Sequence, residues 1–556
     1  MQDEIRIELE KVIETLGWPK IDFTVDYPTD KNTGADVFSN VALVLSKQVR
    51  QNPREIAEQL SAELEGKIDL VTTIEVAGPG FLNFKLHRSY FTLTLDNALK
   101  LGEKWGSNDS EKDQKVIVEY TSPNLFKPLH VGNLVGNIIG ESFTRLFELS
   151  GAEVVRANYP SDIGLPVAKA VWGLKKTGND PSKIEQLGEA YRVGNDAYEL
   201  DGEEKEEIIV INQVLYEGDS QALVDLRLAG IVTSNAQINS ICKKLGTRFD
   251  IEIFESEAAP VGLEIVKERI GDLFVESDGA IVYEGERSGL HTRVFLNSKG
   301  LPTYEAKDVG HFKLKHEQVS GWTKSLIVTG GEQTEYFKVV YAAIKEIFPD
   351  AKDKHLEHIP TGFLTLTTGK MSSRTGNVLT GESIIASIEE AAKEKTKEQD
   401  EVLASKVAVA ALKYEILRHG IGSNIIFDKE KALSFEGASG PYLQYTYARI
   451  QSVLAKADQA GVVASLDISP EETYSVEKIL EQFPGVVESA LQERAPQTLV
   501  VYLTELASEF NSFYASEKIA DINDALAPYK SAVAQAVALT LSRGLWALGI
   551  ETPEKM

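Results

Sequence analysis

A histidine, a glycine and an asparagine lie where an apolar strand and its loop give way to a helix. In the segment His130-Val131-Gly132-Asn133 the imidazole falls at the expected start of that helix. A helix N-terminus presents unpaired N–H groups and a partial positive charge, which together favour a phosphate. An imidazole there can donate to an α-phosphate as pyrophosphate is displaced, and Gly132 leaves room for an adenine ring. Taken alone, this H-x-G-N pattern also fits a plain helix cap.

A second polar segment places a lysine among small hydroxyl groups between two glycines. It reads Gly369-Lys370-Met371-Ser372-Ser373-Arg374-Thr375-Gly376-Asn377. A lysine on such a loop can hold the β- and γ-phosphates and close over bound ATP, although the composition also suits a solvated turn. Both segments in one chain, in this order, predict a converging phosphate site. The predicted ATP contacts are His130, Gly132, Lys370, Met371, Ser372 and Ser373.

The elements around His130 form a strand–loop–helix unit. Val116 to Val118 is a short apolar strand, and a loop with two prolines follows it. From residue 131 to 147, apolar residues recur at helical spacing. Gly151 is placed to end that helix, and residues 152–157 return as a strand. This pattern is typical of the nucleotide-binding half of a doubly wound sheet, so we predict an α/β fold with a Rossmann-type catalytic domain.

The segments on either side of this unit differ in character. The first hundred residues indicate a small α/β unit, with a helix beginning near Pro53 and a polar linker from residue 106 to 115. A charged helical stretch near 165–250 interrupts the catalytic domain, and from about residue 400 onward the apolar stripes predict a helical bundle. Further strands are expected at 73–76, 81–86, 279–283, 293–296 and 325–329. The expected domains are 1–110, 111–430 and 431–556.

Length and composition bound the class of protein. A chain of 556 residues is too long for one compact core, and its 43% apolar and 26% charged residues are ordinary for a globular protein. No apolar run reaches the roughly 18 residues that span a bilayer. The acidic, alternating start MQDEIRIELE is unlike a signal peptide. We therefore expect a cytoplasmic protein with no membrane partner.

Charge and cysteine content constrain partners and metals. The net charge of −26 contrasts with the basic balance common in proteins that contact nucleic acid phosphates. Charge adds over the whole chain, so a local basic groove is compatible with an acidic remainder, and net charge neither supports nor excludes such a partner. The single cysteine, Cys242, excludes an intramolecular disulfide and a Cys-based zinc site. The other histidines lack metal-ligand spacing, so we expect no protein-held metal and no prosthetic group.

The two phosphate motifs resemble those of the class I aminoacyl-tRNA synthetases. His130 to Asn133 resembles their HIGH signature, and Lys370 to Arg374 resembles their KMSKS loop. The surrounding sequence is similar to arginyl-tRNA synthetases in particular, at both ends of the chain as well as around the motifs. The segments that carry this similarity are 40–42, 52–57, 78–81, 118–124, 301–308 and 548–556.

This resemblance implies an activity and a set of partners. It implies an ATP-dependent ligase that activates L-arginine as arginyl-adenylate and transfers it to the 3′ end of tRNA(Arg). It also implies ATP with Mg²⁺ as substrate, a helical anticodon-binding domain, an N-terminal domain that contacts the tRNA, and a monomer. The residues that it assigns to catalysis are Lys127, His130, Asn133 and Lys370.

A pocket for arginine needs hydrogen-bond acceptors, because a guanidinium has five donors and no acceptor. Asp308 and Glu119 are candidates, although either one alone reads as a surface carboxylate. Tyr304 can stack on the flat cation. Asn124 and Gln333 suit the α-amino and carboxylate groups of the substrate. With Ser122 added, the predicted arginine-binding residues are Glu119, Ser122, Asn124, Tyr304, Asp308 and Gln333.

Two features bear on how the family's chemistry would run here. Asn133 stands where the HIGH signature has its second histidine, so His130 is the only titratable member of the motif. An amide still donates a hydrogen bond, and stabilising a phosphate requires donors rather than proton transfer, so we expect activity to survive. Many arginine enzymes lack the first KMSKS lysine and rely on the lysine before HIGH. This chain has both Lys127 and Lys370, and which one acts more on pyrophosphate stays open.

Other functions are weighed against this one. A class I synthetase for cysteine or glutamate shares both phosphate motifs, but the first would require zinc ligands and the second a cationic pocket. A small-molecule adenylyltransferase uses a similar first motif without needing a long helical C-terminal domain. A synthetase-like RNA-binding protein that has lost catalysis is disfavoured by the intact His130 and Lys370. An exchange assay distinguishes these alternatives.

Overall fold

The computed structural model describes residues 1–28, 33–200, 202–367, 380–395 and 400–556. The chain forms two compact units, and neither is a single continuous stretch. The first unit consists of residues 1–105, 453–482 and 509–539, and the second of residues 106–452, 483–508 and 540–556. The helices α16 (Gly440–Gln459), α19 (Pro496–Ser516) and α20 (Ala527–Ala547) each contribute residues to both units.

The N-terminal part of the first unit is an antiparallel sheet, in the order β1-β2-β4-β3, packed against helices. Its helix α3 begins at Pro53, as predicted, with the Asn52 side chain accepting a hydrogen bond from the backbone of Arg54. The strands are β1 (Val25–Asp26), β2 (Val37–Ser39), β3 (Val71–Ala77) and β4 (Phe81–Leu86). The helices are α1 (Gln2–Thr15), α2 (Val41–Val49), α3 (Pro53–Leu64), α4 (Arg88–Leu101) and the 3-10 turn η2 (Gly102–Lys104).

Polar contacts join α4 to α17 (Ser475–Glu481) within the first unit. Arg88 pairs with Glu477 at 3.0 Å and also donates to the Tyr529 hydroxyl. Tyr90 donates to Glu481, and Lys478 pairs with Asp36 at 2.6 Å. Side chains of the helical segment 453–482 therefore pair with side chains of the N-terminal region, although the two are hundreds of residues apart in the sequence.

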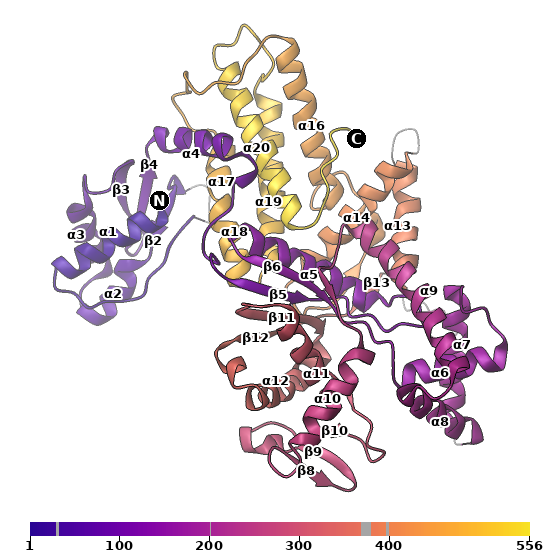
Figure 1. Ribbon diagram of the computed structural model, residues 1–556. Helices are drawn as coiled ribbons and strands as arrows, with labels where there is room; N and C mark the ends of the chain where they lie inside the picture. Colours follow the sequence, from indigo (N-terminus) through magenta and orange to yellow (C-terminus); the bar gives the residue numbers. More distant parts are fainter. Residues whose placement is uncertain (29–32, 201, 368–379, 396–399) are drawn as a thin grey trace. The chain divides into compact units, whose positions relative to one another are not determined.

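The second unit is built on a parallel sheet in the order β12-β11-β5-β6-β7, which confirms the predicted α/β class. α5 covers one face of this sheet, and α11 and α12 lie on the other (Figure 1). The strands are β5 (Lys115–Glu119), β6 (Glu153–Asn158), β7 (Ile251–Glu252), β11 (Lys324–Gly330) and β12 (His355–Thr361). The covering helices are α5 (Val131–Leu149), α10 (Glu255–Glu268), α11 (Tyr304–Gln318) and α12 (Thr334–Ile347).

A helical insertion and a small antiparallel sheet extend this unit. The insertion lies where the charged helical stretch was predicted, between β6 and β7, and consists of α6 (Leu165–Thr177), α7 (Ile184–Glu199), α8 (Glu203–Glu217) and α9 (Gln221–Leu245). The small sheet has the order β10-β9-β8 and is formed by β8 (Phe274–Ser277), β9 (Ala280–Tyr283) and β10 (Arg293–Leu296). The 3-10 turns are η3 (Gly285–Ser288), η4 (Gly331–Gln333) and η5 (Pro349–Asp353).

The part of the chain after residue 400 is mostly helical, as predicted. The exception is β14 (Ile425–Phe427), which pairs in parallel with β13 (Leu364–Leu366). The remaining helices are α13 (Gly381–Lys395), α14 (Glu401–Leu417), α15 (Lys429–Ala432) and α18 (Phe483–Gln492).

Candidate active site

The direction in which the chain crosses the sheet reverses between β5 and β11. From β5 the chain continues to β6 on one side, whereas β11 and then β12 lie on the other side. In doubly wound sheets, ligands bind in the crevice at the carboxyl ends of the strands where this reversal occurs. The loops that follow β5 and β11 therefore define the candidate site.

A cavity of about 500 Å³ lies at this point. All six residues predicted to bind arginine line it: Glu119, Ser122, Asn124, Tyr304, Asp308 and Gln333. The structure thus brings together side chains from the β5 loop, from α11 and from the turn before α12. Their convergence was not deducible from chain order, because they lie in three separate segments.

One face of α11 forms a wall of this pocket. Tyr304, Asp308, His311 and Lys315 all line the cavity, and their spacing of four, three and four residues places them on one helical face. We predicted the first two and missed the last two. The same spacing, continued from Asp308, would have found them in the sequence.

Asp308 is a pocket carboxyl with an unusually high proton affinity. Burial raises its pKa to about 8, and the hydrogen bond from the Tyr336 hydroxyl, 2.6 Å long, opposes this only in part. A bound cation would reverse the shift, because it favours the ionised form of the carboxyl. The site is therefore suited to a positively charged side chain.

Glu119 faces the same pocket but already has cationic partners. Its Oε2 accepts from Lys315 Nζ at 2.5 Å and lies 2.8 Å from His311 Nε2. Burial acts to raise the pKa of Glu119, but the Lys315 charge and the His311 ring overcome it and lower the pKa to about 2. Glu119 is thus a permanently ionised group whose charge is largely balanced within the protein.

Two further pocket residues carry no signal in the sequence. The Tyr159 ring stacks on His311 with centroids 3.7 Å apart, and its buried hydroxyl has no hydrogen-bond partner among the described residues. Glu255 lines the pocket and pairs with buried Lys307 at 2.8 Å. Both arrive from β6 and α10 through tertiary packing, which residue spacing does not report.

His130 lies at the N-terminus of α5, where the phosphate site was predicted. It is the N-cap residue, and its Nδ1 accepts a hydrogen bond of 3.1 Å from Gly132 N. The proton of the neutral ring is therefore on Nε2, which points away from the cap. Burial and then the nearby Lys127 charge lower the pKa of His130. A Cβ at position 132 would lie 3.3 Å from His130 Nδ1, so the glycine avoids a close contact with the imidazole.

Asn133 contacts the protein rather than open space. Its Nδ2 donates to Thr121 O at 2.8 Å, with a second, longer contact of 3.4 Å to Ser122 O. Since Ser122 lines the pocket, this amide ties α5 to the pocket loop. A donor aimed at two carbonyl oxygens is a role that an asparagine fills with its neutral amide.

Lys127 is held against the helical insertion. Its Nζ lies 5.1 Å from the centroid of the Tyr191 ring on α7, and burial lowers its pKa. The same loop is attached to α9, where Ser234 Oγ accepts from Phe126 N at 2.9 Å. The insertion therefore positions the loop that leads to His130.

Lys370, Met371, Ser372 and Ser373 lie outside the described residues. The chain that follows them is described from Thr380, which forms a β-bridge with His130. Gly381 N also donates to Leu129 O at 2.8 Å. The described chain after the second motif therefore resumes beside the first motif.

Within the described ranges of the chain, no group of three or more His, Cys, Asp or Glu side chains is arranged to hold a metal ion. Of the helices described, none combines the length and apolarity needed to cross a bilayer.

Family models match consecutive parts of the chain. The model for tRNA synthetases class I (R), catalytic domain, matches residues 94–429. The DALR anticodon binding domain matches residues 443–556, and the arginyl tRNA synthetase N terminal domain matches residues 1–86.

Curated proteins and solved structures agree with these matches. An arginine–tRNA ligase of Bacillus cereus is 31% identical over 526 residues, covering 92% of each chain, and one of Streptococcus pneumoniae is 29% identical over 568 aligned residues, covering 99% of each. The arginyl-tRNA synthetase structure from Thermus thermophilus aligns over 100% of both chains, with a TM-score of 0.80 at 24% identity. A Plasmodium falciparum structure covers 100% of this chain and 99% of its own, with a TM-score of 0.79 at 20% identity. At such identities, the structural likeness establishes the fold.

Proposed function

Because this chain belongs to the arginyl-tRNA synthetase family of class I aminoacyl-tRNA ligases, we propose that the pocket between β5 and β11 binds arginine and that the N-terminus of α5 binds ATP. The enzyme activates L-arginine with ATP and transfers it to the 3′ end of tRNA(Arg). The observation that carries the site assignment is the convergence of the six predicted residues on one cavity at the switch point of the sheet.

The guanidinium group is recognised chiefly by Asp308. This carboxyl has a pKa raised to about 8, so pairing with a cation relieves the cost of ionising it in a buried place. Glu119 adds negative potential, but Lys315 already occupies one of its oxygens. Tyr304 lies at the entrance, 51% exposed, where its ring can cover the flat cation. Arginine thus binds with its charge toward α11.

The α-amino and carboxylate groups face the strand ends. Asn124 and Ser122 come from the β5 loop, and Gln333 is the N-cap residue of α12. Amide and hydroxyl groups at these places hold the carboxylate oxygen in line with the α-phosphate. Holding both reactants at the switch point converts a bimolecular attack into an oriented one.

The phosphates of ATP lie at the N-terminus of α5. His130 Nε2, the first N–H groups of α5 and Lys127 stabilise the charge that develops as the arginine carboxylate attacks and pyrophosphate leaves. Gly132 lies under the adenine, and Asn133 acts by holding the loop at Thr121 and Ser122. The sequence motif assigns Lys370, Met371, Ser372 and Ser373 to the phosphates of ATP, and Mg²⁺ binds with the nucleotide. The terminal ribose hydroxyl of tRNA(Arg) then attacks the activated carbonyl.

The three domains predicted from the sequence have separate roles in this reaction. Residues 431–556 hold the anticodon, 111–430 carry out both chemical steps, and 1–110 contact the tRNA. The monomeric state, the cytoplasmic location and the absence of a prosthetic group stay predictions.

Arginine-dependent ATP–pyrophosphate exchange, run with and without tRNA(Arg), tests this proposal. Wild type should exchange with arginine and not with lysine, glutamate or citrulline, and Asp308→Asn should lose exchange at least 100-fold, because an amide offers the guanidinium no charge. Asp272→Asn, which removes an exposed carboxylate of the same unit, is the matched control and should match wild type. Exchange with a different amino acid would refute the pocket assignment. No exchange from folded protein would favour the non-catalytic alternative.

A further inference from the structure

The loop after β5 holds two adjacent residues in a strained backbone conformation. Thr121 and Ser122 have φ angles of 77° and 38°. For residues with side chains, and above all for a β-branched one, such angles are strained and persist only where the surroundings impose them. Ser122 lines the pocket. Whatever imposes this conformation therefore also shapes the wall of the arginine pocket.

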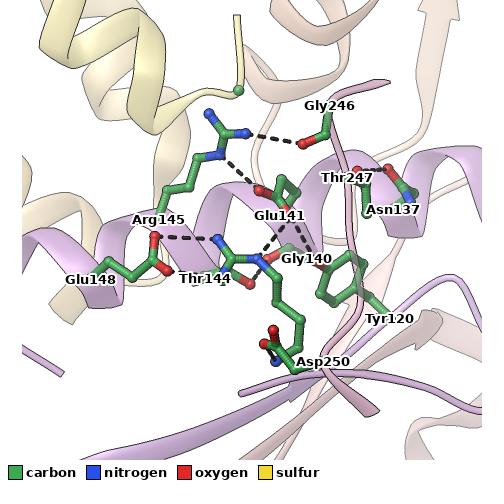
Figure 2. A network of polar contacts seen from close by, with 12 residues as sticks. Tyr120, Asn137, Gly140, Glu141, Thr144, Arg145, Glu148, Gly246, Thr247 and Asp250 are labelled. Atoms are coloured by element: carbon green, nitrogen blue, oxygen red, sulfur yellow. Dashed lines mark hydrogen bonds and ion pairs between the residues drawn. The ribbon is translucent and has the colours of Figure 1, made fainter. Parts of the chain in front are cut away.

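α5 holds the loop from one side. Asn133 donates to Thr121 O, and Asn137 Nδ2 donates to Thr121 Oγ1 at 2.9 Å. Asn137 is fixed in turn, because its Oδ1 accepts from Thr247 Oγ1 at 2.8 Å. Figure 2 shows this last pair beside α5.

Tyr120, immediately before the strained pair, is anchored to the same helix further along. Its hydroxyl donates to Glu141 Oε2 at 2.6 Å (Figure 2). The residue is fully buried. Its ring lies against Gly140, where an added Cβ would come within 2.3 Å of the ring. The glycine lets the ring lie on the helix and lets its hydroxyl reach Glu141, so the loop has a fixed starting point.

Arg145 connects Glu141 to the ends of two other helices. Its Nε donates to Glu141 Oε1 at 2.8 Å, its Nη1 to Trp546 O at 2.9 Å and its Nη2 to Gly246 O at 3.2 Å. Trp546 lies in the last turn of α20, and Gly246 caps α9. The carbonyl groups at helix C-termini carry partial negative charge and lack partners within the helix, so a guanidinium is well suited to join them.

A continuous set of contacts therefore runs from the end of α20 to the pocket wall. It passes from Trp546 O through Arg145 and Glu141 to Tyr120, and from there along the chain to Thr121 and Ser122. Its members belong to the second unit. α20 lies within the segment that matches the DALR anticodon binding domain.

We propose that Arg145 and Tyr120 are positioning residues that couple the end of α20 in the anticodon-binding domain to the strained loop of the arginine pocket. A displacement of α20 on binding tRNA would reach the strained loop through Arg145, Glu141 and Tyr120. The coupling rests on the proposed arginine pocket. It adds the named side chains that join the end of α20 to that pocket.

Two conservative variants test the coupling. Tyr120→Phe removes only the hydroxyl. Arg145→Lys keeps the charge but replaces the planar guanidinium, whose three nitrogens reach three separate acceptors, with a single nitrogen. KM and kcat for arginine and for ATP are measured in the exchange reaction with tRNA(Arg), and again with the same tRNA carrying a substituted anticodon. We expect each variant to raise the KM for arginine about tenfold and to leave the KM for ATP within twofold. The factor by which the anticodon substitution weakens arginine use should shrink toward one.

A double variant and a control complete the test. In Tyr120→Phe/Arg145→Lys the effects should not add, because both break one path. Lys406→Gln, which removes an exposed pair with Glu551 in the same C-terminal segment, should match wild type in every readout. Additive effects, equal losses for arginine and ATP, or an unchanged response to the anticodon would each overturn the coupling. Failure of the proposed function looks different, since wild type itself would then show no arginine-dependent exchange.

Discussion

At the scale of single residues, Asp308 decides at which pH the pocket can hold a cation. Its pKa is raised to about 8 by burial, so it is mostly protonated at pH 6.5 and mostly ionised at pH 8.5. Only the ionised form pairs with a guanidinium. We therefore predict that the KM for arginine falls about 25-fold as the pH rises from 6.5 to 8.5, a factor that follows from one titrating group. Initial rates at saturating ATP and tRNA measure it.

The Asp308→Asn variant separates this carboxyl from other titrating groups. Its KM for arginine should be high and independent of pH over the same range, while the KM for ATP should change little in either protein. A flat arginine profile in wild type would show that Asp308 is not the group that meets the substrate's charge.

Asn133 allows a second test at this scale. Asn133→Asp keeps the shape of the side chain but turns its donor into an acceptor facing the carbonyl oxygens of Thr121 and Ser122. The negative carboxylate then faces two carbonyl oxygens and is repelled by them. We predict that catalytic efficiency with arginine falls at least 100-fold, about 3 kcal/mol, in steady-state exchange assays. Asn133→Ala, which only removes the donor, should lose about tenfold. Equal losses in the two variants would mean that repulsion between the new carboxylate and the two carbonyl oxygens contributes nothing.

At the scale of elements, the sequence was a good guide where local rules act. Pro53 at the first turn of α3 and the apolar spacing of α5 gave these helices nearly as the structure has them. The six pocket residues predicted with the help of the family resemblance line one cavity. Tyr159 and Glu255 could not be predicted, because their position depends on how β6 and α10 pack. The pairing of Glu119 with Lys315 likewise follows from a tertiary contact between β5 and α11.

Lys413 shows how elements are joined where helices end. It is fully buried on α14, and its Nζ donates to Leu245 O and Gly549 O, each at 2.6 Å. These carbonyls belong to the end of α9 and to the segment after α20. Burial, and next the Arg145 charge, lower the pKa of Lys413 to about 7. The amine therefore donates to carbonyl oxygens at two helix ends. Below neutral pH it is protonated, and its charge is then poorly solvated.

A pH series checks this description. The unfolded chain keeps the lysine protonated to about pH 10, so the folded state gains about 1.4 kcal/mol per pH unit above pH 7 as its amine loses the proton. Lys413→Met lacks that gain and leaves two carbonyls unpaired. We predict that its stability deficit grows by about 2–3 kcal/mol from pH 7 to pH 9, measured by hydrogen exchange of α14 amides. Lys406→Met, an exposed change on the same helix, should show no such growth.

At the scale of the whole molecule, the first unit depends on a buried charge pair between distant parts of the chain. The Glu477 side chain is 0% exposed and pairs with Arg88, while the Tyr529 hydroxyl also donates to it at 2.5 Å. Removing one partner of a buried pair leaves an uncompensated charge, at a cost of about 3–5 kcal/mol. Arg88→Met should therefore destabilise the first unit by this amount, seen as faster hydrogen exchange in α4 and α17.

A second change distinguishes charge from packing. Glu477→Gln in the Arg88→Met background removes the stranded charge and should recover most of the loss. Lys100→Met, which breaks an exposed pair on the same helix, should change stability by less than about 0.5 kcal/mol. If the double variant is as unstable as the single one, Arg88 contributes by packing alone.

The composition of the first unit has a consequence for how the protein is made. Arg88 leaves the ribosome 389 residues before its partner Glu477 and 441 residues before Tyr529. At about 5–20 residues per second, the N-terminal sheet waits roughly 20 to 80 seconds for the helices that complete its unit. During that time Arg88, Tyr90 and Asp36 lack the partners that α17 supplies in the complete unit. A nascent chain stalled before residue 475 therefore lacks the partners of these side chains and offers a charged surface that the finished first unit covers.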